Sequence, residues 1–460
     1  MGMIAPQVQL PLQIAPNEQA MIFDVAFIIN AVYQQTIEPT QAGRVPKRIA
    51  NKLRSRLKGI ARFDYTGNDD YLDMICAVMD DLKLIQLVQP PFEGMKAHVA
   101  PSSFIPTWSA MDVIQQTQLL LKEWLSSHHW IDVVGFNYKH GETWNYTNAE
   151  TRFLYFNLDY RLGRQTLLKQ IKQCQPEQWY SIPELIKKIW QEAPLGLRHA
   201  YSTKMSSKEP VDFGTWVQID GECYTGMIAS TLFDLGIVLL GFDAEPSLGN
   251  NPSAFQLTSL GASVLAIEEN QSLNTAFTAD EKEQPPSLIV QPNFEILLLQ
   301  LDLPTIYRLL PFTQINHLGM ASSFKLTGEA LLRGMRSQLT LKQILETLQE
   351  LSARELPQNV VYTLQDWAKQ YKEARLSQVL LIEVPTETIA QQLCTNEKLL
   401  QYGIRQITPC QLAVSADADL NDLKKIIEKC NINIHFTGNV QTTRENNSYN
   451  QLIAKRPDYR

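Results

Sequence analysis

Apolar residues recur every three or four positions in the first part of the chain, which is the spacing of an amphipathic helix. Residues 18–35 and 69–84 follow this pattern. Residues 82–89 and 96–101 are short apolar runs on either side of the turn PPFEG, typical of a two-stranded hairpin. Helices followed by a two-stranded wing are the order of a winged helix-turn-helix domain, which we expect for residues 18–128.

The pattern recurs further along the chain. Residues 165–174, 179–190 and 224–241 have helical spacing, and a strand-like FQL leads through Thr258 into another helix. We therefore expect a second winged-helix-like unit within residues 129–270.

The downstream part changes character. SLIVQPNFEILLLQL indicates two strands broken at Pro292, and helices are expected to start near Pro304, Thr327, Thr340 and Pro357. Strand and helix patterns then alternate as far as INIHFTG. The predicted fold class is mainly α with α+β: tandem winged-helix domains followed by an α+β domain. The expected boundaries are a tail at 1–17, domains at 18–128 and 129–270, a polar linker at 271–287, the α+β domain at 288–438 and a tail at 439–460.

Composition limits the function classes. The 460 residues include 41 basic and 48 acidic ones, a formal net charge of −7, so any contact with nucleic acid must be local. The six cysteines form no CxxC pair and have no histidine at metal-ligand spacing, so we expect reduced thiols in a cytoplasmic protein and no metal site. No apolar run approaches ~18 residues, and we expect no membrane segment.

Sequence motifs of catalysis are missing. The chain has no GxxxxGK[ST] phosphate loop, no GxSxG elbow and no HExxH helix. We therefore expect no catalytic residue, no nucleotide hydrolysis and no cofactor.

One stretch departs from the acidic balance. Residues 43–62, GRVPKRIANKLRSRLKGIAR, carry eight basic side chains and no acidic one. On a helix, Ile49, Leu53, Leu57 and Ile60 would share one face, away from the basic side chains. One basic stripe would hold Lys47, Arg54 and Lys58, and the other Arg48, Lys52 and Arg56. The candidate DNA-binding residues are Arg44, Lys47, Arg48, Lys52, Arg54, Arg56, Lys58 and Arg62, each neutralising a backbone phosphate.

Other interpretations of these features remain open. The basic face is also consistent with a solvated surface or with an acidic protein partner. The aromatic residues at 130–160 would suit either a base-stacking platform or a core between two small domains. Arg198, His199, Lys204 and Lys208 form a second basic stretch, expected in a solvated loop. Changing Arg48, Lys52 and Arg56 to Glu should abolish DNA association with little effect on the melting temperature.

Residues 288–376 resemble the N-terminal, helicase-associated domain of XPB-type helicases. The matching phrases are LIVQPNFEILL, FKLTGEALL and LSARELPQNV, and Lys372 stands where that family usually has Gly. Upstream, GRVPKR, WYSIPELIKKI and LTSLGASVLA resemble phrases of bacterial helicase-associated proteins, with Ala262 where Arg is common. The layout is similar to that of the TFIIH subunit that partners XPB. The resemblance implies a subunit that anchors and stimulates a helicase without catalysing a reaction itself.

We therefore expect a non-enzymatic adaptor that binds the DNA phosphate backbone and recruits a helicase or other ATPase subunit into a hetero-oligomer. Its setting would be repair, transcription or anti-phage defence. One alternative is a stand-alone winged-helix transcriptional regulator, which should discriminate between DNA sites by ~10³ or more. A purely protein-binding scaffold is the other, and it should show no DNA affinity even at low salt.

Overall fold

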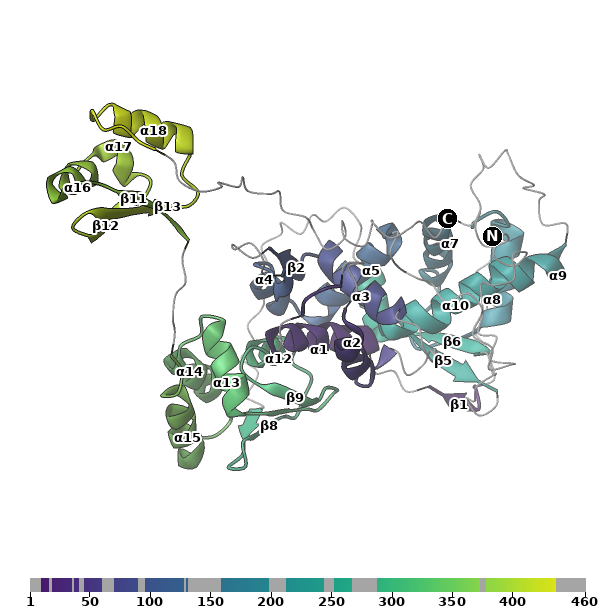
Figure 1. The fold of residues 1–460 in the computed structure, drawn as a ribbon. Helices are drawn as coiled ribbons and strands as arrows, with labels where there is room; N and C mark the ends of the chain where they lie inside the picture. Colours follow the sequence, from purple (N-terminus) through teal and green to yellow (C-terminus); the bar gives the residue numbers. More distant parts are fainter. Residues whose placement is uncertain are drawn as a thin grey trace. The chain divides into compact units, whose positions relative to one another are not determined.

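The chain is mixed in secondary structure and divides into two compact units. The computed structural model describes residues 10–15, 19–34, 37–40, 45–59, 70–89, 96–127, 130, 159–197, 212–243, 252–266, 288–372 and 378–435. The first unit contains the described residues up to Tyr371 apart from a short segment between two strands, and the second is built around residues 372–435 (Figure 1). Each has its own apolar core, and the sheets are small and antiparallel, as in an α+β fold.

The N-terminal elements surround one buried helix. They are α1 (Ala20–Gln34), α2 (Lys47–Arg54), α3 (Asp70–Asp81), β2 (Ile85–Val88), β3 (His98–Pro101), α4 (Ile105–Ser109) and α5 (Val113–Ser126). Residues 20–32 of α1 are buried on every side, because apolar residues occupy its whole circumference rather than one face. Strands β2 and β3 pair antiparallel. The order of helices and hairpin is the predicted one, and the winged-helix assignment stays a prediction.

The middle of the chain builds a four-stranded sheet covered by helices. Its elements are β1 (Gln13–Ile14), α7 (Tyr160–Ile171), β4 (Trp179–Ser181), α8 (Ile182–Glu192), α9 (Phe213–Trp216), the π-helical turn η2 (Val217–Gly221), α10 (Glu222–Met227), the π-helical turn η3 (Ile228–Leu232), β5 (Val238–Phe242), β6 (Ala254–Leu257) and α11 (Ser259–Ala266). The strand order is β1-β5-β6-β4. Thr258 accepts the backbone N–H of Gly261 at 2.8 Å, so the predicted helix start there is confirmed.

Two sequence expectations in this region are wrong. The helix expected to continue to residue 241 ends earlier, since Gly236 adopts a φ of 75° and β5 follows. A left-handed residue closes a helix at low cost when it is glycine. The helix expected from residue 179 begins at Ile182, because Trp179 to Ser181 pair with β6 and Ser181 then caps the helix.

Residues 288–372 form a second sheet with helices. The elements are β7 (Leu288–Val290), β8 (Glu295–Leu298), α12 (Leu303–Leu309), β9 (Gln314–His317), β10 (Ser322–Lys325), α13 (Gly328–Arg336), α14 (Leu341–Leu351) and α15 (Gln358–Ala368). The strand order is β7-β8-β10-β9. The predicted helix starts are confirmed: Thr327 and Thr340 cap their helices, and Pro357 precedes α15. Sequence reasoning missed the hairpin β9–β10.

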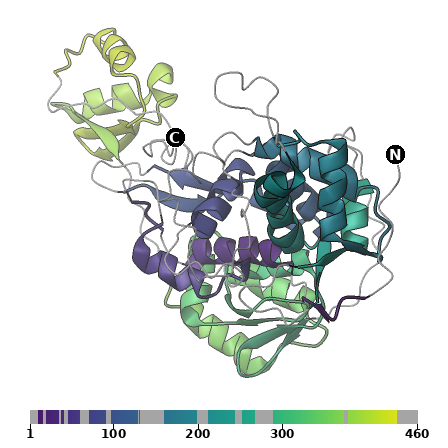
Figure 2. The same ribbon diagram turned by 90° about the vertical axis from the view of Figure 1, so that its right-hand side faces the viewer.

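Helix α1 joins this sheet region to the N-terminal elements within the first unit. The side chain of Asn30 donates hydrogen bonds to the carbonyls of Leu310 at 2.7 Å and Thr313 at 2.9 Å. Arg333 of α13, itself ion-paired with Glu329 at 2.6 Å, donates to the side chain of Gln34. In Figure 2, α1 (purple) crosses between the blue and teal helices and the green elements. Three regions distant in sequence therefore share one core.

The second unit has its own small core. It contains β11 (Val379–Glu383), α16 (Glu387–Cys394), α17 (Glu397–Leu400), β12 (Arg405–Thr408), β13 (Gln411–Ser415) and α18 (Leu420–Glu428), with strand order β11-β13-β12. Sequence reasoning placed residues 288–438 in one domain, whereas compact packing begins anew at Lys372. The physical reason is that the apolar side chains of these elements pack against one another in a separate cluster. The strand expected at INIHFTG is absent over 432–435, and its remaining residues lie outside the described ones.

Candidate nucleic-acid interface

The basic stretch forms α2 and then a turn that returns to α1. Helix α2 ends at Arg54, so the expectation of one helix continuing to Ile60 is wrong. The buried carboxylate of Asp24 accepts the backbone N–H groups of Lys58 at 2.7 Å and Gly59 at 2.9 Å. The hydroxyl of Tyr71 donates to the same carboxylate at 2.7 Å. Because these N–H groups bond to Asp24, they do not extend the helix.

Gly59 is required at this turn. A Cβ added at Gly59 would lie 2.2 Å from the hydroxyl oxygen of Tyr71, far inside van der Waals contact. The close approach of the chain to Tyr71 thus fixes where the basic turn meets the protein body.

Three cations face outward from α2. Lys47, Arg48 and Lys52 are exposed, while Ala50 and Leu53 are buried beneath them. Lys47 and Arg48 occupy the first helical turn, where the macrodipole disfavours positive charge by about 0.3–1 kcal/mol per residue. The unpaired N–H groups of a first turn attract anions, as the two cations do. Helix α2 therefore presents three positive side chains to an approaching polyanion, two in its first turn and Lys52 in its last turn.

Among the remaining candidate residues, Arg56 is exposed as predicted but also contacts the protein body, and Lys58 is half-buried. The guanidinium of Arg56 lies 4.5 Å from the ring centroid of Phe27 and donates a hydrogen bond to the carbonyl of Ile315. Burial lowers the pKa of Arg56 below its ordinary value. The Lys58 ammonium lies 5.0 Å from the ring centroid of Phe23. Figure 1 shows α1 beside β9, the strand that holds Ile315.

Arg54 is half-buried, and its Nη1 lies 3.3 Å from the Asn51 side-chain oxygen. Arg44 and Arg62 lie outside the described residues. The structure therefore leaves Lys47, Arg48 and Lys52 exposed on α2, while Arg56, which is also exposed, and the half-buried Lys58 contact α1.

The aromatic region is described only at its ends. Trp130 is buried and its indole N–H donates to Thr231 at 3.1 Å, and Tyr160 is half-buried at the start of α7. The residues between them, and the second basic stretch with Arg198, His199, Lys204 and Lys208, lie outside the described residues. Trp130 thus agrees with the core interpretation rather than with a stacking platform.

Buried arginines are features that sequence reasoning missed. Arg164 is 1% exposed, and its guanidinium donates to the carbonyls of Trp124 at 2.5 Å, Ser127 at 2.9 Å and Trp130 at 2.9 Å. A single arginine surrounded by helix-forming residues gives no sequence signal of this role. Its contacts tie α7 to the end of α5.

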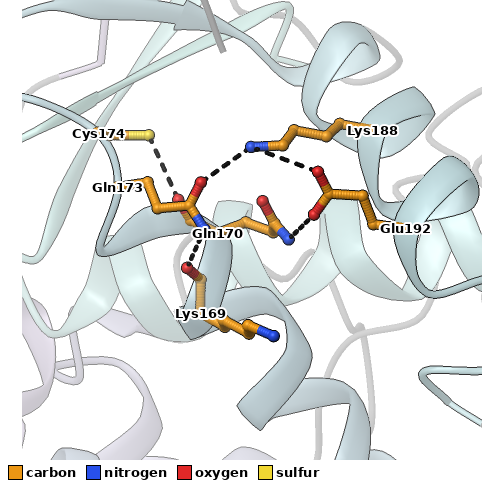
Figure 3. Close-up of polar contacts among 6 residues, drawn as sticks. All are labelled: Lys169, Gln170, Gln173, Cys174, Lys188 and Glu192. Carbon is orange, nitrogen blue, oxygen red and sulfur yellow. Dashed lines mark hydrogen bonds and ion pairs between the residues drawn. The ribbon is translucent and has the colours of Figure 1, made fainter. Parts of the chain in front are cut away.

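A polar cluster between α7 and α8 offers no reactive group. Figure 3 shows Lys188 reaching Gln173 at 3.0 Å and Glu192 at 4.0 Å, while Gln170 donates to Glu192 at 2.8 Å. The thiol of Cys174 is 3.8 Å from the carbonyl of Gln170. Burial raises the pKa of Cys174 to about 12, and Lys188 only partly opposes the shift. A thiol that keeps its proton is a poor nucleophile, so this cluster is structural.

The described residues were also searched for metal and membrane features. They contain no group of three or more His, Cys, Asp or Glu side chains placed to hold a metal ion. Among the helices that the structure describes, none combines the length and apolarity that crossing a bilayer requires.

Comparison with known families gives one match. Residues 288–408 match a family described as helicase conserved C-terminal domain. The match covers the sheet β7–β10, its helices and the first part of the second unit, which is less than half of the chain. No curated protein matches the chain. This part of the chain is therefore similar to a helicase-related domain.

The sheet in the matched region has a distinctive topology. Between residues 288 and 372, every pairing of the named strands is antiparallel. Nucleotide sites of open α/β folds lie at the carboxyl ends of parallel strands. The sheet β7–β10 does not have that arrangement.

Proposed function

We propose that this protein is a non-catalytic DNA-binding adaptor that binds the phosphate backbone through α2. It recruits a helicase or other ATPase through residues 288–408, the helicase-related region. The observation that carries the proposal is the outward set Lys47, Arg48 and Lys52, displayed by an acidic chain in the same compact unit as most of that region. Three exposed cations on one short helix attract a polyphosphate through local charge, which the negative overall charge would not do.

The helicase-related region supports the recruiting role. It matches a domain of helicases, yet the chain lacks a phosphate-cradling loop and the sheet β7–β10 is antiparallel. A chain of this kind suits an assembly in which another subunit hydrolyses the nucleotide. The XPB-like layout and the winged-helix assignment of the upstream units belong to the same proposal, as do the roles in repair, transcription or defence.

A binding titration tests the DNA contact. The full-length protein should bind duplex DNA with an affinity that falls with salt, at a log-log slope of about −0.9 per phosphate contact. Changing Lys47, Arg48 and Lys52 to Glu should reduce the affinity at least tenfold without lowering the melting temperature, since exposed charges contribute little to stability and the first turn of a helix favours negative charge. The sequence alone suggested changing Arg48, Lys52 and Arg56. Lys47 takes the place of Arg56 in the variant, because Arg56 also contacts Phe27 and Ile315.

A matched control separates position from charge. Lys342, Lys369 and Lys425 are exposed on other helices or at their ends, and changing all three to Glu alters the net charge by the same amount. This control should retain most of the affinity. Equal losses in both variants would show that only net charge matters and would contradict a site on α2.

Recruitment needs a separate measurement. Affinity capture of the full-length protein from its native cells should recover an ATPase subunit in stoichiometric amount. Recovery of DNA without any ATPase, together with a ~10³-fold preference for one DNA sequence, would favour a stand-alone regulator instead. Absence of DNA affinity even at low salt would favour a protein-binding scaffold.

A further inference from the structure

A pocket of about 240 Å³ lies where the basic turn meets α1 and β9. Its walls are Phe23, Asp24 and Phe27 of α1, Arg56 and Lys58 of the turn, and residues 315–318. The pocket therefore joins the end of the basic stretch to the helicase-related region, inside the first unit.

The two cations of this pocket are held in place by aromatic rings. Phe23 and Phe27 are one helical turn apart, so their side chains lie on the same side of α1. Lys58 lies over the first ring and Arg56 over the second. Cation–π contacts restrain long side chains that would otherwise lose entropy when they bind a ligand. The positive charge is thus organised before any ligand arrives.

The one carboxylate in the pocket walls already has donors. Asp24 accepts hydrogen bonds from two backbone N–H groups and from the hydroxyl of Tyr71, which reduces its repulsion of an anion. With Arg56 and Lys58 present, the walls carry two positive charges against one negative charge. A singly charged phosphodiester fits this balance.

The sheet end beside the pocket carries exposed apolar side chains. Met320, in the turn between β9 and β10, is 70% exposed, and Leu299, just after β8, is 60% exposed. Leu298 pairs with Ser322 in the β8–β10 register, so Leu299 continues toward that same turn. Met320 is two residues beyond Leu318 of the pocket wall, a reach of about 7 Å at most. Met and Leu are among the residues that DNA-bending proteins insert between base steps.

We propose that the pocket binds one phosphate group of a DNA strand while Met320 and Leu299 pack against the neighbouring base, so that the protein prefers a junction between duplex and single strand. This inference rests on the proposed DNA-binding function. Packing an apolar side chain into a continuous duplex requires unstacking of base pairs, which costs a few kcal/mol per step. At a junction the terminal base is already accessible, so that cost is smaller.

The test compares DNA forms with the full-length protein. Binding to a continuous duplex, a forked duplex and a single strand, each with the same number of phosphates, is measured by fluorescence anisotropy at several salt concentrations. The fork should bind about tenfold or more tightly than the duplex. A double variant, Met320→Ser with Leu299→Ser, should lose that preference and keep its duplex affinity. The control Leu12→Ser changes a side chain that is 73% exposed elsewhere and should behave like the wild type.

A second pair of variants tests the phosphate. Arg56→Gln should weaken fork binding about tenfold and reduce the salt slope by about one unit, while Arg56→Lys, which keeps the charge, should retain most of the binding. Unfolding curves of both variants show whether folding is intact. An unchanged salt slope in a folded Arg56→Gln protein would overturn the phosphate assignment.

The failures of the two proposals are distinguishable. If no DNA form binds, the proposed function fails and this inference fails with it. If DNA binds through Lys47, Arg48 and Lys52 but fork and duplex bind equally, or if the Met320 and Leu299 double variant keeps the preference, only the junction inference is overturned.

Discussion

Arg56 donates a hydrogen bond from its guanidinium to the backbone carbonyl of Ile315, a residue 259 positions further along the chain. The same guanidinium lies over the ring of Phe27. A basic turn near the N-terminus is thereby attached to both the buried helix α1 and a strand of the helicase-related region. If DNA binds at α2, its effect can reach that region through direct contacts.

The hydrogen bonds accepted by Asp24 should be important for folding of the basic turn. Asp24→Ala would leave the N–H groups of Lys58 and Gly59 and the hydroxyl of Tyr71 without their acceptor, and we expect a loss of about 3–5 kcal/mol. Tyr71→Phe removes one donor only and should cost about 1 kcal/mol. Urea unfolding measures both. Equal losses would contradict the view that the carboxylate is the organising group.

Asn30 should determine how α1 docks on the end of α12. Its amide group donates to two backbone carbonyls from a buried position. Asn30→Asp keeps the shape but places a carboxylate oxygen against those carbonyls, and we expect a loss of about 3 kcal/mol or more at neutral pH. The control Asn51→Asp, on the exposed side of α2, should change stability by less than about 0.5 kcal/mol. Thermal unfolding compares the two variants.

Gly261 and Gly403 should respond to alanine for different reasons. A Cβ at Gly261 would lie 2.2 Å from the carbonyl oxygen of Ile237, so α11 must move away from that backbone, and we expect a loss of about 2–3 kcal/mol. At Gly403 the space is open but φ is 66°, which costs an L-residue about 1–2 kcal/mol. Chemical denaturation should give the larger loss for Gly261→Ala. The reverse order would contradict the packing of α11.

Cys174 should stay unreactive over a wide pH range. Burial raises its pKa to about 12, so the folded thiol keeps its proton where an unfolded thiol would lose it. The contribution of this group to stability therefore falls as pH rises from about 9 toward 12. Maleimide labelling with peptide-level mass spectrometry at pH 7 to 9 should modify the half-exposed Cys394, Cys410 and Cys430 before Cys174. Rapid labelling of Cys174 in the folded protein would contradict its burial.

Much of the local structure could be predicted from the sequence. Helix starts at Thr327 and Thr340 follow from side chains that cap their own helix, and these signals act over three residues. Apolar spacing likewise identified α3, α8 and the strands β2 and β3. Where a local signal competed with a tertiary one, prediction was less successful: the pairing of Trp179 with β6 and the left-handed Gly236 overrode helical spacing.

At the candidate site too, local features were predictable from the sequence and long-range contacts were not. Residue spacing placed Lys47, Arg48 and Lys52 on the outside of a helix, away from its apolar face, and the structure agrees. It could not show that Asp24 would end that helix, since this contact joins residues 34 positions apart. The pocket with Arg56 and Ile315 depends on a still longer separation.

The sequence by itself determined the acidic overall charge, the single dense cluster of cations, the lack of catalytic motifs and most helix starts, because these depend on composition or on residues a few positions apart. Only the tertiary structure decided that Arg56 and Lys58 lie over aromatic rings of α1, that α1 lies in the core beside the sheet β7–β10, and that residues 372–435 have a core of their own. Those outcomes depend on contacts between buried surfaces and hydrogen-bonding groups that are far apart in the chain. The local sequence pattern carries no information about such contacts.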